Sequence, residues 1–135
     1  MGGDNAPEIV VDGAAQARER FPDVHFLLFG DESRIEPLLR KHPRLAKSAT
    51  IRHTADAVSS EERPAVALRQ GRNSSMQLAI NAVSSGEAAG VVSAGNTGAL
   101  MAMAKVTLKT LRGIDRPAIV APCPTRVGES AMLDL

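Results

Sequence analysis

The sequence predicts an α/β protein with a mainly parallel sheet that helices cover on both faces. Short apolar runs alternate along the chain with longer segments of helical periodicity, which is typical of βα units. The run Val24–Phe29 is apolar almost throughout, as expected of a strand that is buried on both faces. Glycine turns stand where strands should pass into helices. A length of 135 residues suits a single domain of this kind.

In the first half of the chain the predicted order is helix, strand, helix and strand. The turn Gly2–Pro7 leads into a helix whose apolar stripe ends near Phe21, and the proline of the turn suits the first turn of that helix. The strand Val24–Phe29 follows. The next helix contains Pro37, which must lie in its first turn or kink it. A second strand is predicted at Ala49–His53.

The second half is predicted to contain three helical segments and three short strands. The helices are expected where apolar residues recur at helical spacing, at Pro64–Arg69, Ser75–Ser85 and Thr97–Leu111. The strands are expected at short apolar runs, namely Ala89–Ser93, Ala118–Ala121 and Ala131–Leu135. We expect the last of these to enter the same sheet as the others.

Composition excludes several classes of function. Sixteen Lys and Arg against fifteen Asp and Glu give a net charge of +1, and Trp and Tyr are absent, so neither charge nor base stacking favours nucleic-acid binding. The single cysteine, Cys123, can form neither an internal disulfide nor a Cys-based metal site, and we expect a cytoplasmic protein without a metal or cofactor. The longest uncharged run, residues 88–104, is broken by glycine and polar residues and does not predict a membrane span.

The turn at residues 93–98 is the sharpest local signal for a binding site. Gly95 and Gly98 allow backbone N–H groups to approach a ligand, and the start of the following helix adds unpaired donors and a partial positive charge. The side-chain donors of this turn are Ser93, Asn96 and Thr97. The pattern predicts a phosphate or oxyanion site. The structural alternative is an ordinary connection in which Asn96 or Thr97 caps the helix.

Two further turns at helix starts add candidate anion-binding residues. One carries the guanidinium of Arg69 and the helix-end hydroxyls of Ser74 and Ser75. The other is the opening turn, with Asp4 and Asn5. Because such turns lie at the carboxyl ends of the strands in a parallel sheet, we expect all three to face one crevice. The alternative for the Arg69 turn is a serine cap beside solvated arginines.

Outside these turns, His53 is the strongest candidate, because it ends a predicted strand and can donate a proton or bind an anion near neutral pH. A lone histidine is more often structural, and His25 and His42 have weaker claims. The basic run Arg40–Arg52 contains no acid and could dock an acidic protein, although solvation alone explains it. Cys123 has no neighbouring base and is not expected to be a nucleophile.

Six motifs together resemble the bacterial phosphate acyltransferases of phospholipid synthesis, the PlsX family. In chain order they are MGGDNAP (Met1–Pro7), FGDE (Phe29–Glu32), RNSSM (Arg72–Met76) with Arg69 just before it, VVSAGNTGALMA (Val91–Ala102), GIDRPA (Gly113–Ala118) and LDL (Leu133–Leu135). SAGNTGA and IDRPA are the specific ones. Asn73 stands where the family commonly has an aspartate.

The resemblance implies an enzyme that joins inorganic phosphate to a long-chain acyl group from acyl-carrier protein, giving acyl phosphate for phospholipid synthesis. It implies a three-layer α/β/α fold similar to that of isocitrate and isopropylmalate dehydrogenases. It also implies a cytoplasmic homodimer that associates peripherally with the membrane. Residues 1–135 would then be a single α/β domain, the N-terminal part of a longer enzyme, without its first strand and its C-terminal half.

In such a reaction, fixed hydrogen-bond donors should matter more than activation of the nucleophile, because phosphate is already nucleophilic. Asn96 and His53 are the candidate catalytic side chains. The remaining candidates are expected to bind phosphate or the oxyanion: Asp4, Asn5, Arg69, Ser74, Ser75, Ser93, Gly95, Thr97 and Gly98. The alternatives are a phosphotransacetylase-like enzyme that uses coenzyme A, and a non-catalytic anion-binding module. A nicotinamide dehydrogenase is disfavoured because the chain lacks G-x-G-x-x-G.

Overall fold

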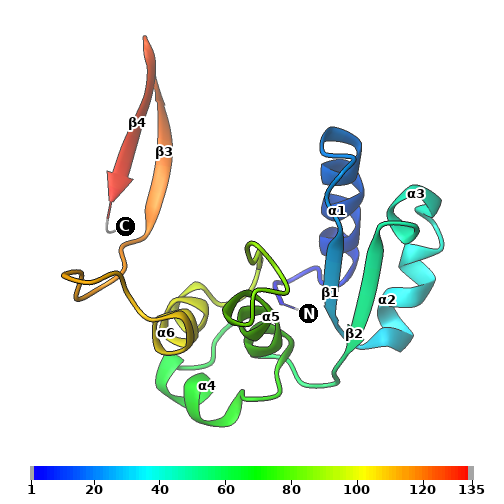
Figure 1. Ribbon diagram of the computed structural model, residues 1–135, viewed down its shortest axis with the longest axis horizontal. Helices are drawn as coiled ribbons and strands as arrows, with labels where there is room; N and C mark the ends of the chain where they lie inside the picture. Colours follow the sequence, from blue (N-terminus) through cyan, green and yellow to red (C-terminus); the bar gives the residue numbers. More distant parts are fainter. Residues whose placement is uncertain (1, 134–135) are drawn as a thin grey trace.

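A computed structural model describes residues 2–133, and its centre is a parallel pair of strands (Figure 1). Strand β1 (Phe26–Gly30) pairs with β2 (Ala49–His53), with Phe26 opposite Ala49 and Gly30 opposite His53. The parallel pairing confirms the mixed α/β class. Within the described residues this sheet holds only these two strands, so the three-layer expectation is met only as a small parallel sheet with helices beside it.

The first three helices share one hydrophobic cluster with β1. These are α1 (Glu8–Arg20), α2 (Glu32–Leu39) and α3 (Pro43–Ala46). The buried members of the cluster are Val11, Leu28, Ile35, Leu39 and Leu45. Asp31 caps α2 by accepting from the Ser33 N–H at 3.0 Å. Pro37 lies inside α2 beyond its first turn, and the helix ends only two residues later.

The other three helices form a second cluster between the sheet and the C-terminal hairpin (Figure 1). They are α4 (Pro64–Gln70), α5 (Ser75–Ser84) and α6 (Thr97–Leu108). Their shared core consists of Val58, Ala67, Met76, Ile80, Ala99 and Met103. Helix α6 ends at Leu108 rather than at the predicted Leu111, because Lys109 takes a left-handed φ of 65°.

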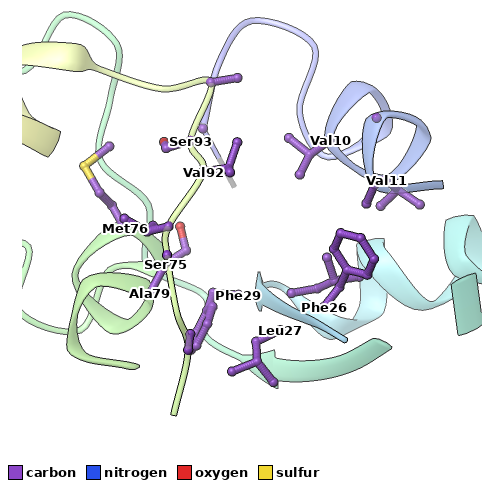
Figure 2. A pocket seen from close by; sticks show the side chains of 18 of the residues that line it. Val10, Val11, Phe26, Leu27, Phe29, Ser75, Met76, Ala79, Val92 and Ser93 are labelled. Atoms are coloured by element: carbon purple, nitrogen blue, oxygen red, sulfur yellow. The ribbon is translucent and has the colours of Figure 1, made fainter. Parts of the chain in front are cut away.

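The predicted strand Ala89–Ser93 is wrong as a secondary-structure assignment. A strand needs a hydrogen-bonded partner, and no strand of the described residues pairs with this segment. An edge cavity of about 700 Å³ instead lies between residues 87–94 and the β1 side of the molecule. Figure 2 shows Val92 and Ser93 on one side of it, with Val10, Phe26 and Leu27 on the other.

The last two strands form an antiparallel hairpin that extends away from the helices (Figure 1). Strand β3 (Val120–Thr125) pairs with β4 (Gly128–Leu133). The expectation that the closing run enters the main sheet is therefore wrong for residues 131–133; Asp134 and Leu135, like Met1, lie outside the described residues. The tight turn between Thr125 and Gly128 brings the run back onto β3 before it can reach another strand. No helix within residues 2–133 has the length and apolar character needed to cross a bilayer.

Candidate functional site

Two of the three predicted turns meet through their glycines. A Cβ atom on Gly3 would lie 2.7 Å from the carbonyl oxygen of Ala94, and Gly3 has a φ of +97°. A Cβ on Gly2 would lie 3.1 Å from the Cα of Gly95. The contact at Gly3 is too close for any side chain and the one at Gly2 is tight, so Gly3 above all allows the opening turn to lie against the turn before α6.

A small pocket opens at this junction. Its volume is about 310 Å³, and its lining residues are Gly3, Asp4, Ser60, Ala94, Gly95, Asn96 and Thr97. The pocket lies at the N-terminus of α6, a helix of 12 residues, where backbone donors and the helix dipole favour a negative charge. Four of the sequence-predicted site residues, Asp4, Gly95, Asn96 and Thr97, are brought together here.

Asn96 uses both ends of its side-chain amide within the protein. Its Oδ1 accepts from the Ala99 N–H at 3.0 Å and so caps α6. Its Nδ2 donates to three carbonyl oxygens of one loop, those of Ser59, Ser60 and Glu62, at 3.2, 3.1 and 2.7 Å. The expected cap is therefore present, and Asn96 also fastens a distant loop to the pocket.

The donors that remain at the start of α6 belong to the backbone and to hydroxyl groups. In the described part of the chain, no acceptor is found for the N–H groups of Thr97 and Gly98 or for the hydroxyls of Thr97 and Ser60. Gly98 also places α4 beside α6, because a Cβ there would lie 3.0 Å from Cγ of Pro64. The arrangement can offer several fixed donors to one anion.

Among the described residues, Asp4 is the only ionisable side chain that lines the pocket. It is exposed, and within residues 2–133 its carboxylate receives no hydrogen bond and joins no ion pair. No Lys or Arg of this part of the chain lines the pocket. The site therefore combines neutral donors on α6 with one carboxylate.

The second predicted turn does not open onto this pocket. Ser74 is 1% exposed, donates to the Gly71 carbonyl at 2.6 Å and accepts from the Gln77 N–H at 3.3 Å, so it caps α5. Ser75 is also buried and lines the edge cavity (Figure 2). The turn reaches the site only through Met76, whose Cε lies 3.3 Å from where a Cβ on Gly95 would be. Two of the three turns therefore share the pocket, whereas the serines of the third are buried at the start of α5.

Three further candidates lie apart from the pocket. Ser93 lines the edge cavity, and its hydroxyl accepts from the Gly95 N–H at 3.2 Å, which shapes the turn. Asn5 is exposed, and its carbonyl accepts from Ile9 at the start of α1. Arg69 is exposed and donates from Nε to the Ala65 carbonyl at 3.1 Å.

His53 belongs to the start of α2 rather than to the pocket. Its Nδ1 accepts from the Glu32 N–H at 3.2 Å. Beside it, the pKa of Asp31 is held below its usual value, mainly because the Ser33 hydroxyl donates to that carboxylate at 2.6 Å, with smaller contributions from His53 and Arg34. His53 thus forms part of a local network at the carboxyl end of β2.

The basic run is largely neutralised within the protein. Arg40 pairs with Glu36, Arg44 with Glu19 and Arg52 with Glu87. These exposed pairs match the solvated alternative better than a preformed docking site for an acidic partner.

Sequence reasoning missed the loop that carries Ser59, Ser60 and Glu62. This loop precedes Asn96 by 34 to 37 residues, and it meets Asn96 through backbone carbonyls. Backbone carbonyls leave no trace in residue identity, so no motif could have placed them at the site. Within the described residues there is also no cluster of three or more His, Cys, Asp or Glu suited to a metal.

Comparison with known proteins decides the family. All 135 residues match the family model described as "Fatty acid synthesis protein". The chain belongs to this family. Its relatives include proteins named phosphate acyltransferase from Rhodospirillum centenum (67% identical), Rhodospirillum rubrum (64%) and Paramagnetospirillum magneticum (59%). Each alignment covers the whole chain but only 38–39% of the relative, so the chain spans less than two fifths of the length of these curated relatives. The resemblance found in the motifs is confirmed.

Proposed function

We propose that this chain is part of an acyltransferase that joins inorganic phosphate to an acyl group. The activity is proposed for the longer protein, of the length of the relatives that the chain matches. The acyl donor is a long-chain acyl group carried as a thioester on acyl-carrier protein, and the products are acyl phosphate and the free carrier. The observation that carries the proposal is the pocket where the Gly3 turn meets the start of α6. Further support comes from a chain that is 67% identical to a protein named phosphate acyltransferase.

The transfer reaction requires fixed hydrogen-bond donors for a developing negative charge, and this pocket has such donors. A phosphate oxygen attacks the thioester carbonyl carbon, a C–O bond forms, and the C–S bond breaks as the carrier leaves as a thiolate and takes up a proton. Negative charge gathers on phosphate and on the carbonyl oxygen. Fixed N–H donors such as those of Thr97 and Gly98 stabilise that charge without having to reorganise, and removal of one such donor typically costs ~10²-fold in rate.

The other candidate residues either shape the pocket or remain predicted binding or catalytic residues. Gly95 lets the backbone approach the anion, and Ser93 holds the Gly95 N–H in place. Ser74 and Ser75 fix the start of α5, which supports Gly95 through Met76. Binding roles for Asn5 and Arg69, and proton donation by His53, stay predictions that require groups now outside the pocket to approach the bound acyl donor.

The setting of the reaction is proposed from the resemblance. Acyl phosphate would feed phospholipid synthesis, and the protein would be a cytoplasmic homodimer that associates peripherally with the membrane. The finding that supports the metabolic setting is the family description itself, fatty acid synthesis.

The test is an acyl-phosphate assay on the full-length protein. Acyl-carrier protein and coenzyme A thioesters of one chain length are supplied separately with phosphate, and acyl phosphate is trapped with hydroxylamine. Faster formation from the carrier-protein thioester supports the proposal. Faster formation from the coenzyme A thioester indicates a phosphotransacetylase-like enzyme instead. Phosphate binding by calorimetry without product from either donor would indicate a non-catalytic anion-binding module and overturn the proposal.

A further inference from the structure

The pocket at the start of α6 combines several hydrogen-bond donors with one carboxylate. On one side are the N–H groups at the start of α6 and the hydroxyls of Thr97 and Ser60. On the other is Asp4, whose carboxylate has no donor partner in the described chain. The Asp4 carboxylate is exposed to water, and it can only accept hydrogen bonds, so an occupant that carries a proton can donate to it whereas an occupant without a proton cannot.

This combination discriminates between tetrahedral oxyanions by their protons. Phosphate near neutral pH keeps at least one O–H group, which can donate to Asp4 while its other oxygens accept from α6. Sulfate has the same shape but carries no proton, so its oxygens would face Asp4 as acceptor against acceptor and charge against like charge. A polar group left facing such a partner costs binding free energy, and no Lys or Arg of residues 2–133 lines the pocket to offset that cost.

We propose that Asp4 is a specificity-determining residue that makes this site accept protonated oxyanions and reject fully ionised ones. The inference rests on the proposed function, in that the protonated oxyanion it selects is the reactant phosphate. Phosphate and arsenate are the accepted class, and sulfate is the rejected one. Asp4 is thus assigned to recognition of the phosphate proton.

The experiment compares Asp4→Asn with wild type in the full-length protein. Binding of phosphate, arsenate and sulfate is measured by calorimetry, and inhibition of acyl-phosphate formation by sulfate is measured in parallel. An asparagine keeps the size of the side chain but can donate to sulfate. We expect the preference for phosphate over sulfate to fall by ~10- to 10²-fold, the size of effect expected when one hydrogen bond to a charged group is lost.

Two further variants make the result specific. Asp23→Asn removes an equal charge from an exposed aspartate that does not line the pocket, and its preference should equal that of wild type. Asp4→Ala removes the acceptor and its charge without adding a donor, so phosphate should lose affinity, sulfate should gain only the relief of repulsion, and the preference should fall less than in Asp4→Asn. Asp4 makes no hydrogen bond within the described chain, so both Asp4 variants should keep the unfolding midpoint of wild type.

Either of two results would overturn the inference. One is a wild-type protein that binds sulfate as well as phosphate. The other is an Asp4→Asn variant with an unchanged preference. Calorimetry separates this inference from the proposed function: Asp4-dependent anion preference without any acyl phosphate would refute the acyltransferase and leave the assignment of Asp4 standing.

Discussion

Asn96 shows how one side chain can serve two structural purposes beside a binding site. The amide oxygen caps α6, while the amide nitrogen is directed at three carbonyl oxygens of the loop at Ser59–Glu62. Those carbonyls would otherwise be free to turn toward the pocket, where their partial negative charge would repel an anion. Since the amide nitrogen already has carbonyl partners in the loop, we expect Asn96 to act by positioning that loop rather than as a donor to the oxyanion.

Substitution of Asn96 by serine separates the two purposes. Serine is a good helix cap but is too short to hold the loop, whereas alanine loses both interactions, and loss of a cap costs about 1 kcal/mol of stability. We expect Asn96→Ser to unfold near the wild-type midpoint, and Asn96→Ala to be less stable by that amount. Both should show faster amide exchange at residues 60–63, measured by hydrogen–deuterium exchange.

Kinetics of the same variants in the full-length protein distinguish positioning from catalysis. Loss of the loop anchor should raise KM for phosphate while kcat changes by less than about tenfold. Loss of an oxyanion donor would instead lower kcat by ~10²-fold and leave KM unchanged. A kcat defect of that size in Asn96→Ser, with normal exchange in the loop, would contradict the positioning role.

At the scale of elements, sequence patterns correctly predicted the helices and strands that depend on interactions between residues close in the chain. Strand β2 and the start of α5 fall where apolar periodicity and a serine cap placed them. The segment at 89–93 has an equally good strand pattern, but strand formation depends on a partner that the pattern cannot report. The site follows the same division: the glycine turn and its cap were predictable, whereas the loop at Ser59–Glu62 meets them through tertiary contacts alone.

The position of α6 depends on the core that it shares with α4 and α5. Met103 is fully buried where α6 meets α4 and α5, and its Cε packs against Gly71. We expect Met103→Ala to reduce the free energy of unfolding by about 2–5 kcal/mol, the usual cost of emptying such a site. Chemical denaturation followed by circular dichroism measures the loss.

A matched control lies on the exposed side of the same helix. Val106 is 59% exposed, so Val106→Ala removes methyl groups without opening a cavity and should change stability by less than about 0.5 kcal/mol. If both substitutions lowered the free energy of unfolding equally, the loss in Met103→Ala would not come from the packed face of α6, and the prediction would be wrong.

At the scale of the whole molecule, the edge of β1 that faces away from β2 has no paired strand within the described residues. Phe26 and Gly30 direct backbone groups toward the β2 side, so Leu27 directs its own toward the edge cavity. The cavity runs from there to residues 89–93, and its walls are mostly apolar. Figure 2 shows side chains from both sides of this space. The space between this strand edge and residues 89–93 has the form of a position for one more parallel strand.

We therefore expect the longer protein to place a strand in the edge cavity, which would make residues 89–93 a true strand and extend the sheet toward the three-layer arrangement. Hydrogen–deuterium exchange of the full-length protein should then show slow exchange at Leu27, Val91 and Val92, whereas the 135-residue chain should exchange quickly there and bind an apolar fluorescent dye. In the full-length protein, a proline in the middle of the inserted strand should bring back fast exchange and dye binding, because proline cannot donate a hydrogen bond to the neighbouring strand. If a long-chain fatty acid, and not the rest of the chain, slowed exchange at these amides, the cavity would be an acyl site and the expectation would be wrong.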